Sequence, residues 1–117
     1  MDAVGVHGLS PETGDEYWSQ PWKLDPSAMS ISTPRFENGL LFLTCFYRGA
    51  MTLKLSMDKP SAAVVWKSKN WKGNRGSEQS ANTDALQSII STPFMRDGFV
   101  YGVCSYGELR CLKLDTG

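Results

Sequence analysis

Residues 91–117, STPFMRDGFVYGVCSYGELRCLKLDTG, decide the fold of this chain. They predict three short strands separated by tight turns. Asp97-Gly98 is a strong hairpin signal, because glycine adopts the positive φ that a two-residue turn requires. Tyr106-Gly107-Glu108 marks a second reversal. Residues 99–104, between the turns, are aromatic, β-branched or small, and are predicted to form a buried strand.

The same layout occurs about 59 residues earlier, in STPRFENGLLFLTCFY, residues 32–47. Asn38-Gly39 stands there in place of Asp97-Gly98, a change that keeps the turn chemistry. The other matches are Thr33 with Thr92, Pro34 with Pro93, Cys45 with Cys104, Tyr47 with Tyr106, and Leu53-Lys54-Leu55 with Leu112-Lys113-Leu114. A period of this kind indicates a repeat protein built from strand-rich units.

The spacing of equivalent positions gives the domain organisation. Residues 8–18 look like the tail of a further copy, and a longer interval between the later copies indicates an insertion rich in Gly, Ser and Asn. Short lead-in strands are predicted at 29–31 and 87–90. We therefore divide the chain into the end of one unit (1–22), a second unit (31–67), an inserted surface loop (68–86) and a truncated third unit (87–117).

Composition excludes several classes. A formal net charge of zero gives no bulk attraction to nucleic acid, and no segment approaches the roughly 18 apolar residues of a membrane-spanning helix. Three cysteines do not suggest a disulfide framework. Cys45, Cys104 and Cys111 are each predicted to fill a small apolar position in a strand, and a single histidine beside such scattered cysteines does not make a zinc site.

One segment carries a family resemblance. GLSPETGDEYW (residues 8–18) resembles the tryptophan-docking motif of quinoprotein-type propellers, Ala-x-Asp-x-x-Thr-Gly-x-x-x-Trp, with Gly8 and Ser10 replacing the Ala and the Asp. The stretch from Thr92-Pro93 to Leu114-Asp115 looks like the PQQ-like repeat, found also in the outer-membrane assembly lipoprotein that scaffolds barrel insertion. The resemblance covers nearly the whole chain apart from the insertion.

The resemblance implies an all-β fold of β-propeller blades, each a four-stranded antiparallel meander stacked on its neighbours. The count of about two and a half blades implies an incomplete propeller, a fragment completed by the remaining blades or by self-association. A tryptophan on the outer strand would pack against the Thr-Gly turn of the next blade. The residues expected in this docking are Thr13, Gly14, Trp18, Trp66, Thr116 and Gly117.

For function, the resemblance implies a non-catalytic scaffold or protein-interaction segment, periplasmic or associated with the cell envelope. The alternative is a fragment of an alcohol or sugar dehydrogenase that uses pyrroloquinoline quinone (PQQ) and calcium. Neither a catalytic residue nor a cofactor or metal ligand is predicted, because the acidic residues fall in turns, where Asp is expected for backbone reasons. Strand parity instead predicts one partner-binding face that combines aromatic and cationic side chains. Its residues are Tyr47, Arg48, Lys69, Trp71, Lys72, Arg75 and Tyr106. The simpler reading, that the two tyrosines only cap their turns, stays open.

Overall fold

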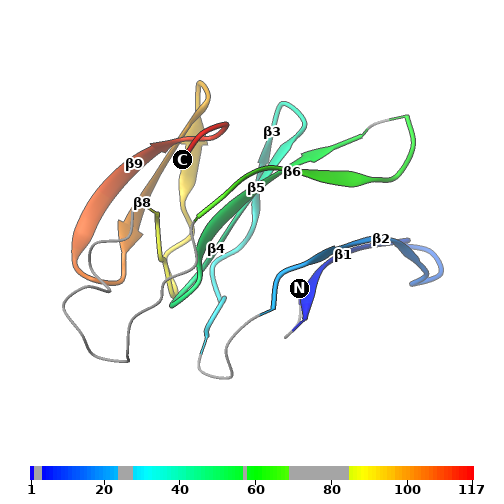
Figure 1. Ribbon diagram of the computed structural model, residues 1–117, viewed down its shortest axis with the longest axis horizontal. Coiled ribbons are helices and arrows are strands. Elements are labelled where there is room, and N and C mark those ends of the chain that lie inside the picture. The colour runs from blue at the N-terminus through cyan, green and yellow to red at the C-terminus, as the bar shows by residue number, and fades with distance from the viewer. Residues whose placement is uncertain (2–3, 24–27, 57, 69–84) are drawn as a thin grey trace.

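A computed structural model describes residues 1, 4–23, 28–56, 58–68 and 85–117 (Figure 1). Over these residues the protein is all-β: nine strands form three antiparallel sheets, and no described residue is helical. Figure 1 shows the three sheets side by side, with the second sheet in the middle. The predicted all-β class is therefore confirmed.

Every sheet follows the order of the chain. The first sheet pairs β1 (Gly5–Leu9) with β2 (Glu16–Pro21). The second is a four-stranded meander of β3 (Arg35–Glu37), β4 (Leu40–Cys45), β5 (Gly49–Leu55) and β6 (Ala62–Lys67). The third is a three-stranded meander of β7 (Phe94–Arg96), β8 (Phe99–Cys104) and β9 (Glu108–Lys113).

The second and third sheets repeat each other in register. Every pair between β4 and β5 has a counterpart between β8 and β9, 59 residues later in the sequence. The end pairs are Leu40 with Lys54 and Cys45 with Gly49 in the second sheet, and Phe99 with Lys113 and Cys104 with Glu108 in the third. The sequence period is thus a structural period.

Two identical hairpin turns set this register. Asn38 and Gly39 have φ angles of 49° and 81°, and Asp97 and Gly98 have 52° and 81°. Two successive positive φ values are the mark of a type I′ turn, whose twist matches that of the flanking strands. The two predicted hairpins are therefore confirmed. Asn38 and Asp97 suit the first position of the turn because Asn and Asp tolerate a positive φ better than most other side chains do.

Two apolar clusters hold the sheets together. One lies between the first and second sheets and includes Val6, Trp22, Leu43, Met51 and Leu53. The other lies between the second and third sheets and includes Phe42, Ala50, Leu86, Val100 and Leu112. Because side chains alternate along a strand, β4 sends Leu43 into the first cluster and Phe42 into the second. The two central strands of the middle sheet, β4 and β5, are therefore covered on both faces.

The predicted lead-in strands at 29–31 and 87–90 are wrong. Neither segment is a strand, and only Met29 forms an isolated bridge, with Phe46. Their polar groups bond elsewhere: the Ser30 hydroxyl donates to the carbonyl oxygen of Thr44 at 2.9 Å, and the Ser88 hydroxyl donates to that of Val103 at 2.8 Å. Side-chain bonds of this kind replace a strand ladder.

Two burial predictions are wrong in part. The strand at 99–104 forms, but only alternate residues are buried, because one face of β8 has no sheet against it in the described part of the chain. Cys45 and Cys104 are buried as expected, whereas Cys111 is exposed on that open face. Sequence alone places Cys111 on a strand and does not say which face of the sheet is covered.

Candidate functional site

The turns at 46–48 and 105–107 lie at the same end of the second and third sheets. Both follow a buried cysteine, and the nitrogens of Arg48 and Gly107 donate to the carbonyl oxygens of Cys45 and Cys104. The ring centroids of Phe46 and Tyr47 lie 3.9 Å apart. Those of Phe46 and Tyr106 lie 5.7 Å apart. Of the seven residues predicted for the partner face, the structure brings together Tyr47, Arg48 and Tyr106.

Tyr47 has a backbone conformation that needs support. Its φ of 69° lies in the left-handed region, which is unusual for a bulky side chain. The nitrogen of Tyr47 donates to the side-chain oxygen of Gln87 at 3.0 Å. Gln87 is buried and comes from the segment between the second and third sheets. The third unit therefore holds the turn of the second in place.

Arg48 and Tyr106 are half-buried. Burial raises the pKa of Cys45 to about 11, and the positive charge of Arg48 works in the opposite direction. Tyr106 packs against the cluster between the second and third sheets. Its hydroxyl oxygen is buried and makes no hydrogen bond with the residues that the structure describes. The Tyr106 side chain thus packs against this cluster while remaining partly exposed.

The inserted segment begins and ends at this same end of the sheets. Ser68 is buried, its nitrogen donating to the Ala50 carbonyl at 2.9 Å and its hydroxyl to the Arg48 carbonyl at 3.1 Å. At the other end, Arg110 donates to the Ala85 carbonyl at 2.5 Å and to Glu108 at 2.7 Å. The remaining predicted face residues, Lys69, Trp71, Lys72 and Arg75, lie outside the described residues.

The predicted docking residues fall into two arrangements. The indole ring of Trp66, on β6, lies on Gly117, where an added Cβ would come within 2.0 Å of the ring. Thr116 is exposed in the same turn. Trp18, on β2, lies over Gly8 of its own hairpin and packs into the cluster shared by the first and second sheets.

The turn between β1 and β2 carries the other two docking candidates. The Thr13 hydroxyl donates to the Asp15 carboxylate at 2.7 Å, and both Thr13 and Gly14 are exposed. Gly14 has a φ of 80°, and a Cβ added there would meet no atom within 4 Å. No described tryptophan therefore lies on this turn.

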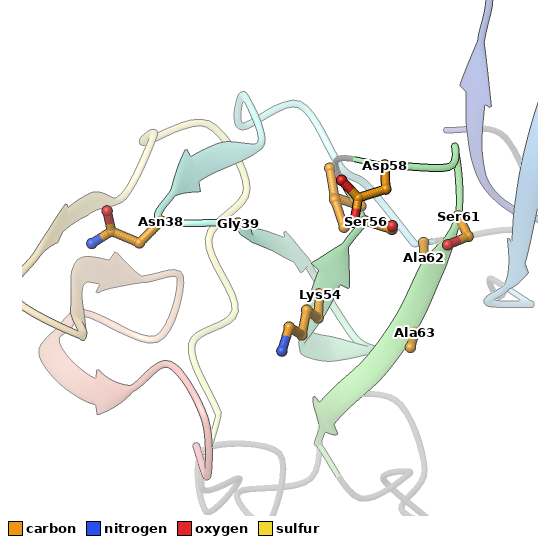
Figure 2. Close-up of a pocket in the computed structure, with 9 residues that line it drawn as sticks. Asn38, Gly39, Lys54, Ser56, Asp58, Ser61, Ala62 and Ala63 are labelled. Carbon is orange, nitrogen blue, oxygen red and sulfur yellow. The ribbon is translucent and has the colours of Figure 1, made fainter.

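The opposite end of the second sheet holds a cavity of about 580 Å³, between the 38–39 turn and the β5–β6 connection. Lys54, Ser56 and Asp58 are among its polar lining residues. Figure 2 shows the Lys54 amine pointing away from Asp58 and Ser56. Binding pockets usually have a few polar groups that converge on the ligand. This cavity lacks such an arrangement.

Sequence reasoning missed three residues at this end of the sheets. Phe46 joins the two tyrosines, Gln87 supports Tyr47, and Arg110 holds the carbonyl of Ala85. Arg110 could have been found by comparing the two copies, because it stands where the second unit has the buried Met51. A charged residue that replaces a core position indicates a polar partner nearby.

Within the described residues, no group of three or more His, Cys, Asp or Glu side chains is placed to hold a metal ion. The part of the chain that the structure describes contains no helix long and apolar enough to cross a bilayer. Comparison of the sequence with protein-family models and with curated proteins gave no match.

Proposed function

We propose that this chain is a non-catalytic protein-interaction and scaffold segment of a β-propeller of the PQQ-like repeat family, in which each sheet is a blade or part of one. The common register of the second and third sheets supports this assignment. So does the packing of Trp66 on Gly117, which joins an outer strand to the turn that ends the next sheet. The remaining blades, or further copies of the chain, are then its immediate partners. The periplasm or cell envelope is the compartment proposed from the resemblance.

The observation that carries the interaction role is the aromatic end, defined here as Phe46, Tyr47, Arg48 and Tyr106. It combines half-buried rings, a cation and a left-handed Tyr47 that Gln87 supports. Tyrosine and arginine, with tryptophan, are enriched at energetically important positions of protein interfaces. Strained backbone is also frequent at functional sites. The aromatic end is accordingly the proposed binding surface for another protein.

The test compares the proteins that co-purify from a bacterial envelope extract with the wild-type chain, a double variant and a control variant, measured by quantitative mass spectrometry. The variant Tyr47→Asn with Arg48→Ser removes a ring and a charge, while Asn still tolerates a positive φ. The matched control is Arg96→Ser, in the hairpin at the opposite end, where the side chain is 72% exposed. We expect the control to retain the partners of the wild-type chain and the double variant to lose them, with both variants folded by circular dichroism.

Two results would contradict the proposal. Retention of the same partners by the double variant would show that the aromatic end does not bind them. Calcium-dependent binding of PQQ by the purified chain, followed by absorbance, together with dye reduction in the presence of an alcohol or sugar, would favour the dehydrogenase alternative.

A further inference from the structure

The acidic side chains are unevenly divided between the two ends of the sheets. Of the eight acidic residues that the structure describes, only Glu108 lies beside the aromatic end, and Arg110 donates to its carboxylate at 2.7 Å. The others lie at the far ends of their sheets, in or beside the turns there. They are Glu12, Asp15, Glu16, Glu37, Asp58, Asp97 and Asp115.

Cationic side chains accompany the rings of the aromatic end. Arg48 belongs to it and is half-buried. Lys67 is exposed and precedes Ser68, whose hydroxyl donates to the Arg48 carbonyl at 3.1 Å. Because the acid described beside this end is already bound by an arginine of its own strand, the charges of Arg48 and Lys67 leave the surface positive.

The backbone around Arg48 is held on both sides of the side chain. Its nitrogen donates to the Cys45 carbonyl at 3.2 Å, and its carbonyl accepts from Ser68. The preceding residue, Tyr47, is fixed by the buried side chain of Gln87. A surface that is ordered before binding loses less entropy when a partner binds. The cation and the rings are therefore arranged in advance.

We propose that the aromatic end binds an acidic segment of a partner protein, with the carboxylates of that segment at Arg48 and Lys67 and its carbon chain against the three rings. Arginine binds a carboxylate in a planar, two-bond geometry. Complementary charge selects the partner and speeds its association, and contact with the rings excludes water from the pair. The inference rests on the proposed function and names the class of partner for the same surface.

Two other occupants fit this surface less well. In a second copy of the chain, acids of the exposed turns are already bonded: Asp15 accepts from the Thr13 hydroxyl at 2.7 Å, and Glu16 bonds to His7 at 2.6 Å. These bonds would have to be given up. A nucleic acid draws its affinity from many cations at its phosphates, whereas the formal net charge of this chain is zero.

The probe for the test is a fluorescein-labelled peptide, EAEFEAE, added to the intact chain, and its control is QAQFQAQ. We expect saturable binding of the acidic peptide by fluorescence anisotropy, and binding on the order of tenfold weaker for the control. Raising the salt from about 0.02 M to about 0.2 M should also weaken binding of the acidic peptide roughly tenfold. Equal binding of the two peptides would overturn the proposal.

A matched pair of lysines locates the peptide. Lys67→Glu should weaken binding of the acidic peptide roughly fivefold, because repulsion replaces attraction at an exposed position. Lys54→Glu makes the same change of charge at an exposed lysine of the same sheet, beside the cavity at the opposite end, and should bind normally. Equal weakening by both would show that the charge of the whole chain governs binding, and would overturn the proposal.

The same assay identifies the other occupants. Tighter binding of a short thymidine oligonucleotide than of the acidic peptide would overturn the proposal in favour of a nucleic acid. Concentration-dependent dimerisation that the acidic peptide reverses would overturn it in favour of a second copy. Loss of partners by the Tyr47→Asn, Arg48→Ser variant without any preference for the acidic peptide would remove only the acidic class and leave the protein-interaction role in place.

Discussion

β4 and β8 occupy the same place in two sheets of identical register, yet they have different surroundings. In β4, the last four residues are all buried, because the first and third sheets cover its two faces. In β8, only Val100, Gly102 and Cys104 are buried, and the residues between them face outward. The comparison shows that strand pairing in this protein is a property of each repeat. Burial is a property of the stack of sheets.

A second difference lies inside the interfaces. The second unit has the large Leu43 on β4 and the small Ala28 in the preceding segment, both at the cluster shared with the first sheet. The third unit has Gly102 at the strand position and Leu86 in the preceding segment, where a Cβ on Gly102 would come within 2.5 Å of Leu86. In the second unit the large side chain therefore comes from the strand, and in the third unit it comes from the segment before the sheet.

The largest expected effect separates the covered and open faces. Phe42→Ala should lower the free energy of unfolding by about 3–5 kcal/mol, because the ring is fully enclosed between two sheets. Tyr101→Ala, at the equivalent position of β8, should cost less than about 1 kcal/mol, because the ring is 40% exposed. Urea unfolding at low protein concentration measures both. Equal losses would mean that the face of the third sheet is covered in solution.

The exchange of volume between units predicts a double-mutant cycle. Leu86→Ala should cost about 3 kcal/mol by leaving a cavity, and Gly102→Leu should cost about 1–3 kcal/mol by overpacking against Leu86. The double variant has Leu on the strand and Ala in the preceding segment, which is the arrangement that Leu43 and Ala28 have in the second unit. It should recover at least half of the summed loss in the same unfolding measurement. Strictly additive losses would contradict the account of shared space.

Alkaline pH should weaken the interface between the first and second sheets. The pKa of Cys45 rises on folding from 9.0 to about 11, because burial disfavours the thiolate. The contribution of the Cys45 thiol to the free energy of unfolding is fully present below pH 9. It is lost as the pH increases toward 11, which lowers the free energy of unfolding by about 2–3 kcal/mol. Unfolding free energies from pH 8 to 11 test this. The Cys45→Ala chain should lose less over the same range, and an identical decline in both chains would assign it to other groups.

The smallest expected effect tests the contact of Trp66. Gly117 and Gly107 have nearly the same φ, 87° and 88°, so Ala at either position meets a similar backbone cost of about 1 kcal/mol. Only Gly117 also lies under the indole ring, whereas nothing lies within 4 Å of a Cβ at Gly107. Gly117→Ala should therefore lower the free energy of unfolding by about 1 kcal/mol more than Gly107→Ala does, and the melting temperature should fall further in the same direction. Equal shifts would show that the ring is not held there.

Much of the fold could be predicted from residues close together in the sequence. The Asn-Gly and Asp-Gly turns, the alternation in the following strands and the 59-residue period are all local or repeated signals, and the register they imply is present. The lead-in segments could not be predicted. Their serines bond to the carbonyls of Thr44 and Val103, which belong to strands formed later in the chain.

The candidate site was predictable only in part. Tyr47 and Tyr106 stand out as repeated residues at equivalent turns. Phe46 and Gln87 do not, because Phe46 is replaced by Ser105 in the other copy and Gln87 reaches Tyr47 across 40 residues of sequence. Contacts between residues so far apart in the sequence follow from how the sheets pack.

The sequence by itself determined where strands begin and turn, because φ preferences and alternation act over a few residues. Only the tertiary structure decided which sheet faces are covered, and hence why Cys104 is buried while Cys111 is exposed. The physical reason is that burial depends on a neighbouring sheet. For β4 both neighbours lie within this chain, and for the outer face of β9 the described residues supply none.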